Sequence, residues 1–76
     1  MALQRAPILS IRALTDRELQ IALQVANGLS SKEIATILAI SPKTVDIHRK
    51  SINKKLGVQS PVMVARILIR AGVISA

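Results

Sequence analysis

The sequence predicts an all-α fold of four short helices. Three observations support this class: Thr or Ser residues that typically cap helix starts recur along the chain, glycines follow three of the apolar stretches, and no long stretch alternates with the period of two typical of a strand. The 76 residues suffice for one small domain. We divide them into an N-terminal arm or linker, residues 1–13, and a helical domain, residues 14–76.

The first two helices each begin with a capping box, in which a Thr or Ser hydroxyl and a Glu three residues later satisfy each other's backbone amides. Thr15 and Glu18 form the first box, and Ser30 and Glu33 form the second. The predicted helices span residues 15–26 and 31–38. Helical spacing gives the first helix an apolar face of Leu19, Ala22, Leu23 and Ala26. Asp16, Glu18 and Glu33 are better explained as helix-start residues than as catalytic carboxylates.

The last two helices begin at Ser-Pro pairs, since Ser is a good cap and Pro is favoured at the first helical position. Ser41-Pro42 and Gly57 bound a helix over 42–56, and Ser60-Pro61 and Gly72 bound one over 61–71. In the third helix, one apolar stripe faces the core: Val45, Ile52 and Leu56.

A turn of about three residues, Ala39-Ile40-Ser41, joins the second and third helices. Ala35 supplies the small residue that a tight helix–turn–helix needs where its helices meet. Four apolar side chains are expected to pack the two helices together: Ile34, Leu38, Ile40 and Val45. A helical hairpin in another bundle would look similar, so the pattern favours the helix–turn–helix without establishing it.

The outward face of the third helix carries Lys43, Ile47, Lys50 and Lys54. A cationic helix presented in this way fits the major groove of DNA, where its N-terminal half reads base edges. A solvated lysine face is the alternative interpretation. Ile47 favours DNA, because contact with a thymine methyl explains an outward isoleucine and solvation does not.

The amino-acid composition excludes several classes of function. Without cysteine and with a single histidine, we expect no disulfide, metal site or catalytic triad, and therefore no enzyme, metal or cofactor. The absence of aromatic residues removes the stacking platforms used for single-stranded nucleic acid. No apolar run is long enough to span a membrane, so we expect a cytoplasmic protein without a membrane partner. The net charge of +7 favours a polyanionic partner.

Several motifs together resemble one family. Leu14-Thr15-Asp16-Arg17-Glu18, the stretch from Gly28 to Ala35, the stretch from Leu38 to Val45, and Lys55-Leu56-Gly57-Val58 are similar to the LuxR/FixJ-type DNA-binding domain over residues 14–74. The resemblance implies a four-helix domain that binds double-stranded DNA as a dimer in a bacterial transcription regulator. With no sensor or receiver domain in the chain, we expect an isolated output domain or a stand-alone effector. RNA polymerase is a further candidate partner.

The resemblance also implies site residues. By position, the base-reading residues are Asp46, Ile47 and Lys50. The phosphate-contacting residues are Lys32, Lys43, Thr44, His48, Arg49, Lys54 and Lys55. Asp46 departs from the expected basic or neutral residue: it accepts from cytosine N4, repels a phosphate, or only pairs with Lys50. His48 is either a structural group or a phosphate contact.

The helix over 61–71 departs from the family pattern after Ser60. We expect Pro61, Ala65, Leu68 and Ile69 to face the core. The outward residues are then Met63 and Ile67, flanked by Arg66 and Arg70, and the family's use of this helix makes these four the predicted dimer interface. A loosely covered core edge is the alternative.

Two other functions stay open. The domain could be an interaction module that pairs with a full-length relative and titrates it, an idea motivated by Asp46 and by the apolar last helix. A membrane-active set of cationic helices is a third option, which the capping and stop signals of a compact fold oppose.

Overall fold

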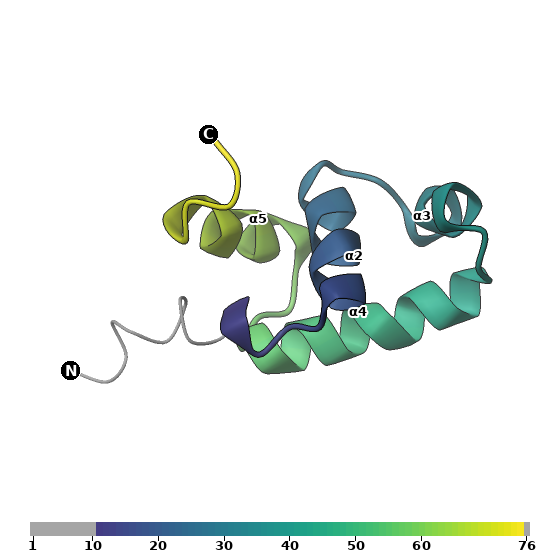
Figure 1. The fold of residues 1–76 in the computed structure, drawn as a ribbon, viewed down its shortest axis with the longest axis horizontal. Helices are drawn as coiled ribbons and strands as arrows, with labels where there is room; N and C mark the ends of the chain where they lie inside the picture. The colour runs from purple at the N-terminus through teal and green to yellow at the C-terminus, as the bar shows by residue number, and fades with distance from the viewer. Residues whose placement is uncertain (1–10, 76) are drawn as a thin grey trace.

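The computed structural model describes residues 11–75 and confirms the all-α class (Figure 1). Ile11 and Arg12 are helical, and four longer helices follow them in this part of the chain. They are α2 (Asp16–Ala26), α3 (Ser31–Leu38), α4 (Pro42–Leu56) and α5 (Pro61–Arg70). The predicted arm, residues 1–13, lies outside the described residues except for its last three.

Each helix begins at the cap that the sequence predicts. The Thr15 hydroxyl accepts from the Glu18 amide at 3.1 Å, and Glu18 accepts from the Thr15 amide at 2.8 Å. The Ser30–Glu33 box has the same two distances. The remaining caps, Ser41 and Ser60, accept from the backbone amides three residues onward. Because each cap satisfies amides that the helix leaves free, these local sequences determine where the helices start.

The helix α2 occupies the centre of the domain. In Figure 1 α2 stands on the long helix α4, with α5 on one side of it and α3 on the other. The helix α5 packs mainly on α2, and α3 packs mainly on α4, whereas α4 and α5 touch little. The recognition helix proposed from the sequence, α4, is therefore held by α2 and α3.

One apolar cluster joins all four helices, and it corrects the predicted face of α2. Of Leu19, Ala22, Leu23 and Ala26, only Ala22 is fully buried, and the other three are partly buried. The deepest side chains of α2 are instead Ile21 and Val25, together with Ala22. The prediction failed because α2 is apolar around much of its circumference, so its neighbours α4 and α5 decide which side is covered.

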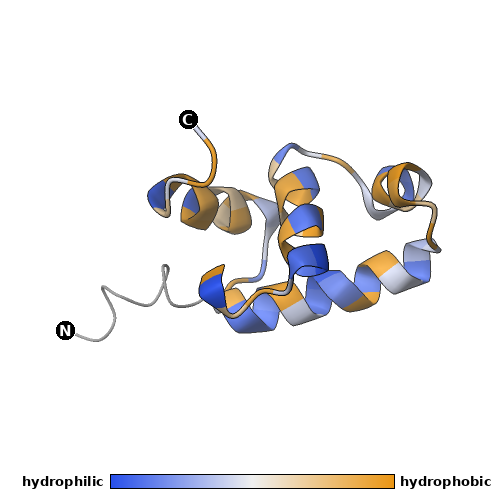
Figure 2. Cartoon of the chain, viewed as in Figure 1, coloured by the Kyte–Doolittle hydropathy of each residue, from blue (hydrophilic) through white to orange (hydrophobic). Residues whose placement is uncertain are grey.

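The predicted inward face of α5 was also partly wrong. Leu68 is buried as expected, but its companion is Val64, while Pro61 and Ile69 are exposed. Ile67, expected to point outward, packs half-buried against the core. Figure 2 shows the cause, since α5 is hydrophobic over most of its surface while α4 alternates between hydrophilic and hydrophobic residues. Among residues 11–75, no helix combines the length and the apolar character needed to cross a membrane.

Candidate nucleic-acid interface

The turn between α3 and α4 sets the geometry of the candidate interface. Ala39 ends α3 in the left-handed conformation, with φ of 56° and ψ of 43°. The Ile40 amide donates back to the Ala35 carbonyl at 3.0 Å, which closes the end of α3 before Ser41 caps α4. Ala35 is buried at this junction, as are Ile34 and Val45. The predicted helix–turn–helix is therefore present.

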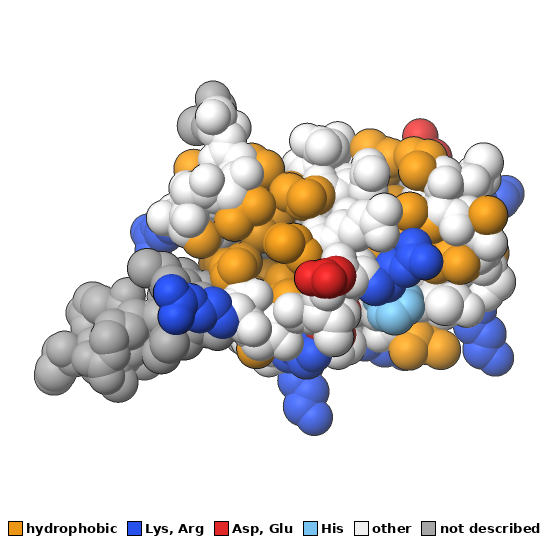
Figure 3. Space-filling view, viewed as in Figure 1, with side chains coloured by type: hydrophobic (Ala, Val, Ile, Leu, Met, Phe, Trp, Pro, Cys, Tyr) orange, Lys and Arg blue, Asp and Glu red, His pale blue; other side chains and the backbone are white. Residues whose placement is uncertain are grey.

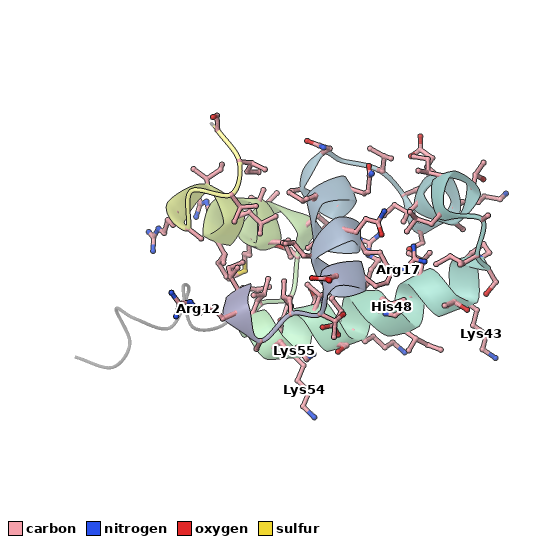
Figure 4. The ribbon with its side chains drawn as sticks, viewed as in Figure 1. Arg12, Arg17, Lys43, His48, Lys54 and Lys55 are labelled. Atoms are coloured by element: carbon pink, nitrogen blue, oxygen red, sulfur yellow. The ribbon has the colours of Figure 1, made fainter. Side chains whose placement is uncertain are left out.

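The two sides of α4 differ sharply. Val45, Ile52 and Leu56 are buried, as predicted. On the opposite side, four side chains are exposed: Lys43, Ile47, Lys50 and Lys54. Ile47 exposes 60% of its surface and does not belong to the apolar core cluster. Lys43 and Lys54 extend from α4 away from the other helices (Figure 4), and cationic side chains project along this edge of the molecule (Figure 3).

The exposed lysines of α4, and Lys32 of α3, form no ion pair with any described residue. Within residues 11–75 the one ion pair joins Lys55 to Glu18, so no carboxylate lies within salt-bridge distance of Lys32, Lys43, Lys50 or Lys54. Exposed and unpaired ammonium groups attract phosphates and release the counterions that surround them on DNA. Lys54 in the last turn of α4 also interacts favourably with the helix dipole.

Asp46 and Arg49 meet at a serine of α3. The Ser31 hydroxyl donates to Asp46 Oδ1 at 2.5 Å and accepts from Arg49 Nη1 at 3.1 Å. Asp46 is exposed and Arg49 is half-buried. The pairing of Asp46 with Lys50 considered from the sequence is not formed, because Asp46 leans toward α3 instead.

Glu18 lies on the other flank of α4, where it does more than cap α2. The residue is only 5% exposed. Glu18 Oε1 accepts from Lys55 Nζ at 2.7 Å, and Oε2 accepts from the Ser51 hydroxyl at 2.6 Å. The hydrogen bond from Lys55, followed by that from Ser51, lowers the pKa of Glu18 to about 2, and outweighs the opposing effect of burial. Lys55, a predicted phosphate contact, is therefore already engaged inside the domain.

Three further predicted phosphate contacts, Thr44, Lys32 and His48, lie on α3 or α4. Thr44 is half-buried, and its hydroxyl lies 2.8 Å from that of Ser41. Lys32 is exposed in the first turn of α3. His48 is half-buried and forms no side-chain hydrogen bond within residues 11–75.

The predicted dimer residues line one shallow groove. The groove has a volume of ≈ 190 Å³ and is lined by Val58, Met63, Arg66, Ile67 and Arg70. Met63 is 44% exposed, while Ile67 and Val58 form the floor against the core. Hydrophobic side chains gather over α5 on the face that Figure 3 shows.

Sequence patterns missed three residues that shape the interface: Glu18 as a buried group, Ser31 and Ser51. Their partners lie 15 to 37 positions away in the chain, beyond the reach of helical spacing. One available signal was charge: Glu18 and Asp46 are two of only four acids in a strongly cationic chain.

Comparison with known proteins agrees with this architecture. Residues 12–68 match the family model described as "Bacterial regulatory proteins, luxR family". The transcriptional regulatory protein UhpA of Escherichia coli is 51% identical over 53 residues, which cover 70% of this chain and 27% of that protein. The nitrate/nitrite response regulator protein NarP of the same organism is 47% identical over 49 residues, covering 64% of this chain and 23% of that protein.

A third relative is the response regulator GacA of Pseudomonas aeruginosa, 41% identical over 64 residues that cover 84% of this chain and 30% of that protein. The chain thus spans less than a third of the length of each of these relatives. The family match and the helix–turn–helix geometry coincide in the same residues. The chain therefore belongs to the luxR family of bacterial regulatory proteins, as a helix–turn–helix DNA-binding domain.

Proposed function

We propose that this domain binds double-stranded DNA sequence-specifically, with α4 in the major groove, and thereby serves a bacterial transcription regulator. The observation that carries the proposal is the outward face of α4, where an exposed isoleucine lies among lysines that form no ion pair with the described part of the chain. A major groove accepts a helix of this kind, and its N-terminal half then faces the base edges.

Three residues of α4 are proposed to read bases. Lys50 donates to guanine O6 and N7, and Ile47 contacts the methyl group of thymine. Asp46 is the third, because a carboxylate accepts from the amino group of cytosine. All three are exposed within the first nine residues of α4.

The proposed phosphate contacts surround these residues and carry no sequence information. They are Lys32, Lys43, Thr44, His48, Arg49, Lys54 and Lys55. Lys32 approaches from the start of α3, and Lys43 and Lys54 approach from the two ends of α4. Lys55 contributes least, since Glu18 holds its ammonium.

The assembly on DNA is also part of the proposal. We infer a homodimer through α5, with the groove of Met63, Arg66, Ile67 and Arg70 at the contact. Relatives are called transcriptional regulatory protein and response regulator, which supports a role in transcription control. We propose the cytoplasm as the place of this role and RNA polymerase as a further partner.

The test begins with duplexes selected from a random pool by the 76-residue chain. Binding should weaken steeply as salt rises, because each neutralised phosphate releases counterions. Lys50→Ala should weaken the selected duplex by about 1–3 kcal/mol and relax the preference at one base pair. Lys54→Ala is the matched control: it should weaken all duplexes alike and reduce the salt slope.

Two results would contradict the proposal. Absence of duplex binding at ~50 mM salt would remove the DNA-binding function and favour the interaction module that titrates a relative. Equal losses on every duplex for both lysine variants would leave DNA binding in place but refute the assigned roles.

A further inference from the structure

The Ser31 hydroxyl connects two α4 residues through a hydrogen-bond chain of fixed direction. An ionised carboxylate only accepts and a guanidinium only donates, so the single hydroxyl proton points to Asp46 and the oxygen lone pairs face Arg49. No other arrangement of donors satisfies both contacts. Ser31 is therefore matched to its two partners on α4.

The hydrogen bond from Ser31 holds one oxygen of the Asp46 carboxylate and does not involve the other oxygen. Oδ1 is engaged by Ser31, whereas Oδ2 forms no hydrogen bond within residues 11–75. The side chain as a whole stays exposed, one position before Ile47. A carboxylate held by one oxygen presents the second oxygen in a defined direction.

The positive charge of Arg49 reduces the repulsion that the Asp46 carboxylate would meet beside DNA phosphates. A carboxylate beside the DNA backbone is repelled by phosphates, and Asp46 is the sole acid in α4. Arg49 is linked to Asp46 through one hydroxyl, so its positive charge lies close to the carboxylate without forming a direct ion pair. The carboxylate can therefore approach DNA while retaining a free acceptor.

We propose that Ser31 is a positioning residue for sequence recognition, which holds Asp46 so that Oδ2 accepts from the N4 amino group of cytosine. The inference rests on the proposed DNA binding and adds a residue of α3 that does not itself touch a base. An immobilised side chain loses less conformational entropy when it contacts DNA, and this preorganisation strengthens the discrimination.

A purely structural role for Ser31 predicts a different effect of its substitution on DNA affinity. If the serine only ties α3 to α4, its loss lowers stability and affects all duplexes equally. If it acts through Asp46, its loss affects the ratio of affinities for two duplexes that differ at one base pair. That ratio also cancels the general increase in affinity expected when a negative charge is removed.

The experiment uses the 76-residue chain, a duplex selected from a random pool by that chain, and the set of its single-base-pair variants. Asp46→Ala should abolish a preference of roughly tenfold for a C·G pair at one position. Ser31→Ala should reduce the same preference severalfold, and adding it to Asp46→Ala should change the preference no further. Ser31→Thr keeps the hydroxyl and should restore the preference.

Thr36→Ala is the matched control, because the Thr36 hydroxyl lies on the same helix but bonds to the Lys32 carbonyl and not to α4. It should leave every ratio unchanged. The inference is overturned if Ser31→Ala weakens all duplexes equally, if the two substitutions act independently, or if Asp46→Ala alters no preference. These outcomes presuppose duplex binding, so they are distinct from a failure of the proposed function.

Discussion

Glu18 is a buried carboxylate that serves two helices at once. It accepts from the Thr15 amide to complete the cap of α2, and from Ser51 and Lys55 to hold α4. Burying a charge is costly unless hydrogen bonds replace the lost water, and three donors do so here. The same donors favour the ionised form, which explains the low pKa of Glu18.

The domain should lose stability in acid through this carboxylate. Its pKa falls from an ordinary 4.5 to about 2 on folding, so the stabilisation is complete above pH 4.5 and is lost as the pH falls from 4.5 toward 2. Urea unfolding followed by circular dichroism between pH ~6 and pH ~2 measures this loss. Glu18→Gln should flatten the pH dependence and lower stability near neutral pH by about 1–3 kcal/mol.

Neighbouring residues provide the controls for this prediction. Lys55→Ala should flatten the pH dependence of stability in part, since it removes the largest contribution to the low pKa of Glu18. Lys54→Ala should leave the pH dependence unchanged, because Lys54 forms no ion pair within the described residues. The pKa of Glu33 is also lowered, by hydrogen bonds from the Ser30 amide and hydroxyl, but Glu33 is exposed. A Glu18→Gln variant with the same acid profile as the unaltered chain would contradict the assignment.

At the scale of elements, the caps show what local sequence can determine. All four helix starts follow from a hydroxyl residue at the cap and its partner amide three positions onward. The end of α3 is different, because the left-handed position holds Ala39 where glycine is the usual residue. A side chain in this conformation costs roughly 1–2 kcal/mol.

Ala39→Gly should therefore stabilise the domain slightly. Relief of the strain outweighs the extra chain entropy of glycine, which is about 0.5–1 kcal/mol. The control is Ala71→Gly at the end of α5, where φ is −78° and only the entropic cost applies. Thermal unfolding should give a higher Tm for the first variant and a lower Tm for the second. A lower Tm for both would show that Ala39 is not strained.

The buried faces were less predictable than the helix ends. In α4, polar residues separate the buried stripe from the outward one, and the sequence alone identified both. In α2 and α5, apolar residues lie on several sides, so Ile21, Val25 and Val64 were missed and Ile67 was misplaced. Contacts such as Ser31 with Asp46 depend on how α3 lies against α4, which no periodic pattern specifies.

For the whole molecule, the position of α2 separates two surfaces. The outward lysines belong to α4 and the apolar groove belongs mainly to α5, and α2 packs on both of these helices, which touch each other little. A domain bound to DNA through α4 therefore keeps the groove free for a second copy. One small groove buries little area, so the proposed association of free domains should be weak, and neighbouring half-sites should strengthen it by raising the effective concentration.

Two half-sites should accordingly be occupied cooperatively, by roughly tenfold or more. Met63→Lys should abolish this cooperativity, because it places a third cation in a groove already bordered by Arg66 and Arg70. Val62→Lys is the control: Val62 is 65% exposed on the same helix and does not line the groove. Gel-shift titrations of one-site and two-site duplexes measure both effects.

Met63 suits this test better than Ile67, which supports the core and would affect folding as well. Binding to a single half-site should survive both lysine variants. Unchanged cooperativity in Met63→Lys would place the dimer contact outside the groove.

The division of α4 into a packed stripe and a free stripe has an evolutionary consequence. Ile47 and Lys50 support no part of the core, and exposed substitutions of this kind usually change stability by less than about 0.5 kcal/mol. If these two residues read bases as proposed, a duplicated gene can acquire a new target site through changes at both positions while every intermediate still folds. On that proposal, a regulator with this helix needs no extra stability before its target changes.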